Sequence, residues 1–192
     1  ETQVGIVAAV YASLRPAPAV NYRGNFHVHV RVPGLARDVE TTKRVIVYAT
    51  RVGQRAYDLV DPLPPEPDSF FADDAASGAL VRWRRRKASH HTVLTQQCLD
   101  RISAATTPEE LRAAHVPMSA AGKPQFHLAQ RAGVNFRSMW ENPGETIEFR
   151  HFCMSLDLVE LCDAMRWCVV FTGAALDGGE PDPSTLLWAG AR

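Results

Sequence analysis

Two short segments carry side chains that could do chemistry together. Asn25 to Val30 reads Asn-Phe-His-Val-His-Val, and Gly144 to Phe152 reads Gly-Glu-Thr-Ile-Glu-Phe-Arg-His-Phe. Because side chains alternate faces along a β-strand, His27 and His29 share one face of a strand there. Glu148 and Arg150 share a face of the other strand in the same way. Two imidazoles, a carboxylate and a guanidinium on one cleft would suit a divalent metal and a phosphate.

Each pair also has a simpler interpretation. Two histidines on a half-exposed strand can be solvated, and spacing alone slightly favours this for His27 and His29. An ion pair between Glu148 and Arg150 is a common surface feature of small energetic value. The apolar residues on the opposite face of the second strand, and the apolar helix after it, favour a functional site at Glu148.

The strands and helices expected along the chain are mixed and do not form repeated βαβ units, which predicts an α+β fold. A strand is expected from Asn25 to Val32, stopped by Pro33-Gly34, and Asp38 can cap a helix that runs to about Val60. Thr107-Pro108-Glu109-Glu110 is a capping box with proline at the first helical position, and predicts a short helix. Other helices are expected over 3–14, 68–87, 89–102 and 158–174, the last capped by Asp157 and nearly encircled by apolar residues.

A hairpin is expected just before the last of these helices. The turn Asn142-Pro143-Gly144 lies between two β-rich runs, Val134–Met139 and Thr146–Phe152, which should pair antiparallel. Asn135 would then lie on the strand beside Glu148. Short strands are also expected at 125–127 and 133–138, and a loop at 117–122.

Composition places the chain among ordinary globular proteins. It has 192 residues, 46% of them hydrophobic, and a formal net charge of zero. We expect a single domain over residues 1–178 and a Pro/Gly-rich tail over 179–192. No apolar run is long enough to span a bilayer, and the four cysteines show no disulfide spacing, which favours a cytoplasmic protein with reduced thiols.

Other motifs carry less information. The basic run Arg82 to Lys87, followed by His90-His91, could contact phosphates, but a solvated helix face is preferred, so nucleic acid is not favoured as a partner. The chain has no P-loop and no Gly-x-Ser-x-Gly motif. We do not expect His151 and Cys153 to form a Cys–His nucleophile.

The ordered set of segments resembles the amidoligase family, a branch of the glutamine synthetase / glutamate–cysteine ligase superfamily of carboxylate–amine ligases. The set is His-Val-His-Val on a strand, a helix rich in Val and Ile, and Arg131-x-Gly133-Val134-Asn135. It ends with Thr146-Ile147-Glu148-Phe149-Arg150 and with Ser155-Leu156-Asp157 opening a long apolar helix. The resemblance covers about residues 21–175 and rests on no single specific motif.

The resemblance implies a curved antiparallel sheet with helices on its outer face, a glutamine synthetase-like fold. ATP with Mg²⁺ or Mn²⁺ would lie on the concave face. His27 and Glu148 would bind metal, His29 would approach the phosphates, and Arg150 with Glu148 would act in catalysis. Asn135 and Arg131 would face the same cleft. The implied activity is ATP-dependent formation of an amide or isopeptide bond through an acyl phosphate, from small-molecule or peptide carboxylates and amines.

One departure from the family pattern leaves alternatives open. The family begins with a strand carrying a Gly-x-Glu-x-Glu-like set that completes the metal sites, and no such set precedes His27. We therefore expect the C-terminal part of an enzyme, completed by a second chain or an upstream segment, that binds Mg·ATP weakly or not at all by itself. The alternatives are a non-catalytic binding or scaffold subunit on the same fold, and a metal-dependent hydrolase that uses His27, His29 and Glu148 with zinc or manganese.

Overall fold

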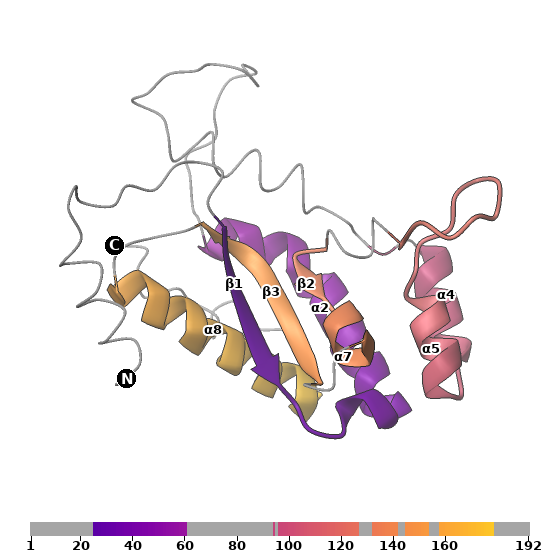
Figure 1. Cartoon of the computed structure of the whole chain (residues 1–192), viewed down its shortest axis with the longest axis horizontal. Helices are drawn as coiled ribbons and strands as arrows, with labels where there is room; N and C mark the ends of the chain where they lie inside the picture. The colour runs from indigo at the N-terminus through magenta and orange to yellow at the C-terminus, as the bar shows by residue number, and fades with distance from the viewer. Residues whose placement is uncertain are drawn as a thin grey trace, which may run out of the picture.

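The computed structural model describes residues 25–60, 94, 96–126, 132–141, 145–153 and 158–178 (Figure 1). Within these ranges, helices and strands are mixed and the strands form a small antiparallel sheet, which confirms the α+β class. In chain order the elements are β1 (Asn25–Arg31), a 3-10 turn (Leu35–Arg37), α2 (Val39–Val60), α4 (Gln96–Ala104), α5 (Pro108–Ala114), β2 (Val134–Asn135), α7 (Arg137–Glu141), β3 (Thr146–Cys153) and α8 (Leu158–Asp177).

The sheet has β3 at its centre, with β1 on one side and β2 on the other. Both neighbours run antiparallel to β3. Glu148 lies opposite His29 of β1 and opposite Asn135 of β2, so three polar residues form one row across the sheet. This confirms that Asn135 lies on a strand paired with the strand of Glu148. The curvature of the sheet and the glutamine synthetase-like fold stay predictions.

A β-bulge interrupts the pairing of β1 with β3. Phe26 pairs with Phe152 and Val28 pairs with Phe149, so β3 has one more residue than β1 between these two pairs. An extra residue in one strand breaks the alternation of side chains locally. This explains why His151 and Phe152 are both buried although they are consecutive.

The other face of the sheet is the hydrophobic core. Ile147 and Phe149 of β3 are fully buried, and the predicted alternation of this strand is confirmed at these positions. The Phe149 ring packs edge-on against Trp167 and Phe171 of α8, with ring centroids 6.1 and 5.3 Å apart. Such aromatic pairs contribute about 0.5–1.5 kcal/mol each beyond the area they bury. Helix α8 therefore packs behind the strand of Glu148, as predicted.

Helix α8 is not buried all round, however. Its buried residues recur at helical spacing on one side, whereas Val159, Val169 and Val170 are 67, 60 and 50% exposed. The prediction of an encircled, fully buried helix is wrong, because a run of apolar residues in the sequence does not show which sides have packing partners. The helix also extends three residues beyond the predicted end, to Asp177.

The link from β1 to α2 is fixed by polar contacts. Gly34 adopts φ +82°, a conformation that favours glycine, and its N–H donates to a Glu145 carboxylate oxygen at 3.0 Å. Asp38 accepts from the Thr41 N–H at 3.0 Å, which confirms the predicted cap of α2. This link ties the start of α2 to the residue that precedes β3.

Helix α2 then lies across the core with its apolar side inward. Its buried side chains fall at helical spacing, and the ring of Tyr48 meets Phe171 of α8 edge-on at 5.0 Å. Helices α2 and α8 contact each other, and both contact the sheet. Together they cover the apolar face of the strands, so the residues of the opposite face are held from behind by a packed core.

Several predicted boundaries are wrong. The run at 133–138 is a strand only at Val134–Asn135, and the predicted hairpin partner Val134–Met139 includes the start of helix α7 at Arg137. No strand forms at Gln125 or Phe126 in the described part of 125–127; Pro124 instead forms an isolated bridge with Met118. In the region predicted as helix over 89–102, α4 begins at Gln96 and ends at Ala104.

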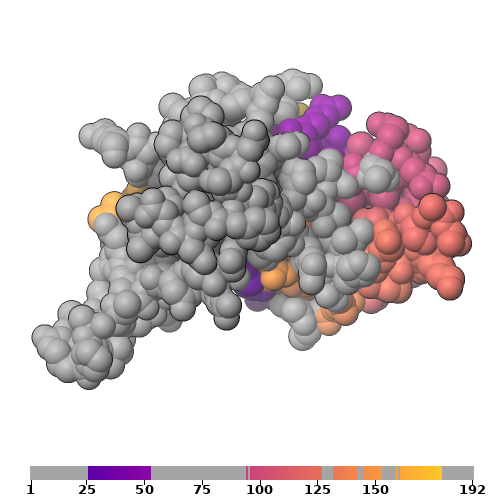
Figure 2. All heavy atoms as spheres, turned by 90° about the horizontal axis from the view of Figure 1, so that it is seen from above, coloured from indigo at the N-terminus to yellow at the C-terminus, as the bar shows by residue number. Residues whose placement is uncertain are grey.

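Helix α5 has the predicted start. Thr107 and Glu110 form the reciprocal hydrogen bonds of a capping box, and Pro108 is the first helical residue. Helices α4 and α5 contact each other. In Figure 2 they and the turn that follows, coloured pink to salmon, gather at one end of the molecule.

Other predictions lie outside the described residues. They are the helices at 3–14 and 68–87, the basic run 82–87 with His90 and His91, the side chain of Arg131, the cap Asp157 and the tail 179–192. In the part that is described, Cys98, Cys162 and Cys168 are free thiols, and Cys98 and Cys168 are buried. No helix there is long and apolar enough to cross a membrane.

Candidate functional site

The polar face of the sheet gathers four of the predicted side chains around the carboxylate of a fifth, Glu148. We call these residues, His27, His29, Asn135, Glu148 and Arg150, the polar cluster. His27 and His29 come from β1, Asn135 from β2, and the other two from the central strand. The predicted convergence of both histidines with the strand of Glu148 is therefore confirmed.

Glu148 is the centre of the polar cluster. His27 Nδ1 lies 2.9 Å from its Oε1, and Asn135 Nδ2 donates to its Oε2 at 2.6 Å. His29 Nε2 and Arg150 Nε each lie 3.9 Å from the same Oε1. Only 10% of the Glu148 side chain is exposed, so these contacts replace much of its hydration. A buried carboxylate is tolerated because donors surround it.

The charge state of Glu148 follows from two opposing effects. Burial raises the pKa of its carboxyl group. The hydrogen bonds from His27 and Asn135, together with the charges of Arg150 and His27, outweigh burial and lower the pKa to about 2. Glu148 is therefore ionised at neutral pH and is not a proton donor there.

Asn135 links the polar cluster to the next helix. Its amide nitrogen donates to Glu148, while its side-chain oxygen accepts from the Arg137 N–H at 2.9 Å. This second bond satisfies one of the backbone donors in the first turn of α7, which have no partner within the helix. The amide is thus fixed at both ends, which holds Glu148 in one orientation.

The two histidines differ in their surroundings. His29 is the more exposed, with 45% of its side chain accessible, and its Nδ1 lies 3.3 Å from the hydroxyl of Thr146. His27 is 30% exposed, and its Nε2 is buried without a hydrogen-bond partner among the described residues. With Nδ1 beside a carboxylate, the Nε2 of His27 is left to contact a further group.

The polar cluster fits an anion better than a directly bound magnesium ion. Arg150 keeps 22% of its side chain exposed, and its guanidinium is a cation whose planar fork of N–H groups suits an anion. Magnesium prefers several carboxylate and water oxygens, but Glu148 is the only carboxylate of the cluster and both its oxygens already have donors. Across the described ranges, no group of three His, Cys, Asp or Glu side chains is arranged to hold a metal. The described residues alone therefore do not fit a metal held by His27 and Glu148, and that ligation stays a prediction.

Thr146 was not among the predicted site residues. It precedes Glu148 by two positions, so the alternation that paired Glu148 with Arg150 also places Thr146 on the polar face. The sequence therefore already indicated Thr146 as a residue of the polar face. The contact of Asn135 with the start of α7 was not predicted, because no helix was expected at that position.

The comparisons with known proteins add no assignment. No protein family, no curated protein and no solved structure matches this chain. The geometry of the polar cluster is therefore the basis for any functional conclusion.

Proposed function

We propose that this chain is part of an ATP-dependent carboxylate–amine ligase and that the polar cluster binds phosphate groups during catalysis. One observation supports this more than any other. An ionised glutamate holds two histidines, an asparagine and an arginine on one face of a sheet whose other face is a packed core. Rigid elements that present several donors to one place are what a charged transition state requires.

In this proposal Arg150 and His29 bind phosphate oxygens. Both side chains are partly exposed, and each has a nitrogen 3.9 Å from the Glu148 carboxylate. A guanidinium fork on a phosphate gives two parallel hydrogen bonds, which a lysine ammonium cannot reproduce. Glu148 supplies a negative charge beside both groups, and the hydrogen bond from Asn135 orients Glu148.

The reaction has two steps. An oxygen of the substrate carboxylate attacks the terminal phosphorus of ATP, and ADP leaves, which gives an acyl phosphate. The amine then attacks the acyl carbon, phosphate leaves, and the amine nitrogen loses a proton. Charge accumulates on phosphate oxygens in both steps, where Arg150 and His29 would stabilise it. Mg²⁺ or Mn²⁺ would supply further charge neutralisation, with carboxylate ligands from outside the described residues or from a second chain.

A hydroxamate assay tests the proposal. Hydroxylamine captures an acyl phosphate as a hydroxamate, which ferric ion colours, so the natural amine need not be known. The protein would be incubated with Mg·ATP, hydroxylamine and a mixture of standard amino acids and dicarboxylic acids. We expect ATP-dependent hydroxamate, and a loss of about tenfold or more in Arg150→Lys with an unchanged melting temperature.

Arg166→Lys is the matched control, because Arg166 is an exposed residue of α8 that pairs with Asp163. Equal hydroxamate yields from the Arg150 and Arg166 variants would remove Arg150 from the proposed site.

The second candidate is a non-catalytic binding subunit on the same fold. It is favoured by the fact that the polar cluster has a single carboxylate among the described residues, already engaged by His27 and Asn135. Saturable binding of Mg·ATP without any hydroxamate would support this candidate over the ligase. Absence of both would contradict both candidates.

The third candidate, a metal-dependent hydrolase, has less support. It needs His27, His29 and Glu148 to converge on one ion, whereas His27 Nδ1 points at the carboxylate itself. Zinc binding by the wild-type protein that is absent in the His27→Ala variant would support this candidate.

A further inference from the structure

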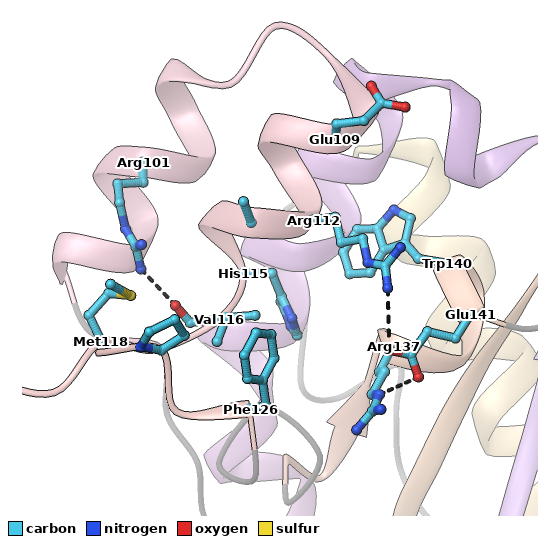
Figure 3. A pocket seen from close by; sticks show the side chains of 12 residues that line it. Arg101, Glu109, Arg112, His115, Val116, Met118, Phe126, Arg137, Trp140 and Glu141 are labelled. Atoms are coloured by element: carbon cyan, nitrogen blue, oxygen red, sulfur yellow. Dashed lines mark hydrogen bonds and ion pairs between the residues drawn. The ribbon is translucent and has the colours of Figure 1, made fainter. Parts of the chain in front are cut away.

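A separate hollow lies between helices α5 and α7 and the turn that follows α5. Its volume is about 510 Å³, within the range of small-molecule sites. None of the residues of the polar cluster lines it. Figure 3 shows Arg112, Arg137 and Glu141 on one side of the hollow and Arg101 and Met118 on the other.

Flat and apolar side chains form much of its wall. Trp140, Phe126, Met118 and Val116 line it, and the ring of Phe126 is 59% exposed although it is large and apolar. An exposed phenylalanine at the edge of a hollow leaves apolar surface that a ligand ring could cover. His115 lies in the interior, its ring centroid 5.6 Å from Phe136 and 5.4 Å from Trp140.

The charged residues of the hollow do not balance. Among the described residues that line it, three arginines face two glutamates, Glu109 and Glu141. Burial lowers the pKa of His115 to about 4, so that imidazole is neutral at pH 7. The lining therefore has one positive charge in excess.

The arginines also have donors to spare. Arg112 Nη2 lies 3.4 Å from Glu141 Oε1, and Arg137 Nε contacts Oε2 of the same carboxylate. Each contact uses one of the five N–H groups of a guanidinium. Arg101, by contrast, donates to a neutral acceptor, the carbonyl of Val116, at 2.8 Å. A second carboxylate could bind beside Glu141 without displacing it.

We propose that this hollow binds a small aromatic monoanion, a flat ring that bears one carboxylate. The ring would pack against Phe126 and Trp140, and the carboxylate would accept from Arg112 and Arg137. The single charge follows from the lining, because Glu109 and Glu141 would repel a second negative group. This site is independent of the ATP site proposed above.

The probe is 2-naphthoate, titrated into the whole chain by calorimetry at pH 7. The neutral alcohol 2-naphthylmethanol has the same ring system and lacks the charge. We expect saturable binding of the acid and about tenfold weaker binding of the alcohol, the effect of one charge-assisted hydrogen bond. No saturable binding of the acid, or equal affinities for acid and alcohol, would overturn the proposal.

Two substitutions should change the affinity in opposite directions. Arg112→Ala removes a donor, and we expect about tenfold weaker binding of the acid. Glu141→Gln removes the competing carboxylate and frees both arginines, so the acid should bind about three- to tenfold more tightly. A purely structural effect of these substitutions would weaken binding in both. Tighter binding of the acid by the Glu141→Gln variant, with unchanged binding of the alcohol, therefore distinguishes the loss of a competing carboxylate from a structural effect.

Two further variants complete the test. Ala113→Trp, at an exposed position of α5 that lines the hollow, should block acid and alcohol alike. Arg166→Ala, on the exposed side of α8, should leave both affinities unchanged. Unimpaired binding in Ala113→Trp, or a loss in Arg166→Ala equal to that in Arg112→Ala, would show that the probe binds elsewhere and would refute the site.

Discussion

Replacing Glu148 by glutamine should remove a pH-dependent part of the stability. The fold lowers the pKa of this carboxyl group from 4.5 to about 2, because the donors around it outweigh the effect of burial. A group with a lowered pKa in the folded state stabilises the fold above its unfolded pKa. That stabilisation is lost as the pH falls from 4.5 towards 2. The neutral glutamine side chain has no such dependence.

The size of the effect follows from the shift. A pKa lowered from 4.5 to about 2 corresponds to at most about 3 kcal/mol of unfolding free energy at neutral pH, lost at no more than about 1.4 kcal/mol per pH unit. His27, His29 and Arg150 are present in both proteins and face the carboxylate in the folded wild-type protein.

Urea unfolding of both proteins at half-unit intervals between pH 6 and 3 measures this difference directly. We expect the wild-type protein to be the more stable at pH 6, and the gap between the two to narrow steadily below pH 4.5. A gap that stays constant down to pH 3 would refute the view that His27, Asn135 and Arg150 stabilise an ionised Glu148. Glu109→Gln, at an exposed position of α5, is the control and should show no comparable change.

Three further predictions concern the core, a cap and a buried histidine. Leu161→Ala should cost about 2–5 kcal/mol in urea unfolding, because the side chain is buried on the inner side of α8; an unchanged midpoint would contradict its burial. Thr107→Ala should lower the unfolding free energy by about 1 kcal/mol, since it removes the capping hydrogen bond to the Glu110 N–H, whereas Thr107→Ser should not. The fold lowers the pKa of His115 from 6.5 to about 4, so stability present above 6.5 should be lost as the pH falls towards 4. His115→Phe should flatten the pH dependence of unfolding across that window, and an unaltered pH profile would show that His115 is not buried in its neutral form.

Period-two alternation predicted which site residues share a face on each strand. His27 and His29, and likewise Glu148 and Arg150, share a strand face because they are two positions apart. That they lie near each other required β1 to pair with β3 across more than a hundred residues, and no local pattern specifies such a pairing. That the two strands lie side by side was a hypothesis, and the structure confirms their pairing.

The wrong boundaries have physical causes. The run Val134–Met139 has apolar residues that suit a strand, but Asn135 satisfies the first backbone donor of a helix that begins at Arg137. Side-chain capping of this kind depends on how Asn135 is held by Glu148, a contact made only in the folded protein. The hollow beside α5 was likewise hidden, because Arg112 and Glu141 are far apart in the sequence and meet only through tertiary packing.

The exposed valines of α8 show a further limit of pattern reading. An apolar run predicts that a helix is buried, but the number of packing partners decides how many of its sides are covered. Here α2 and the sheet cover one side of α8, and Val169 and Val170 lie on the other side. The sequence predicted the helix and its packing behind the strand of Glu148, but not that one side of the helix would be exposed.

Spectra of the histidine rings during titration with Mg·ATP test most directly whether the polar cluster binds phosphate groups. His27 and His29 belong to the polar cluster, whereas His115 lies in the separate hollow and His151 in the core. With ring-labelled histidine and assignment by single substitutions, nuclear magnetic resonance follows each imidazole separately. If the polar cluster binds phosphate groups, the His27 and His29 resonances should shift as Mg·ATP is added, even where binding is weak. These shifts should disappear in Arg150→Ala, while the His115 and His151 resonances stay in place. Shifts confined to His115, or no shift of His27 and His29 at the highest nucleotide concentration, would contradict phosphate binding by the polar cluster.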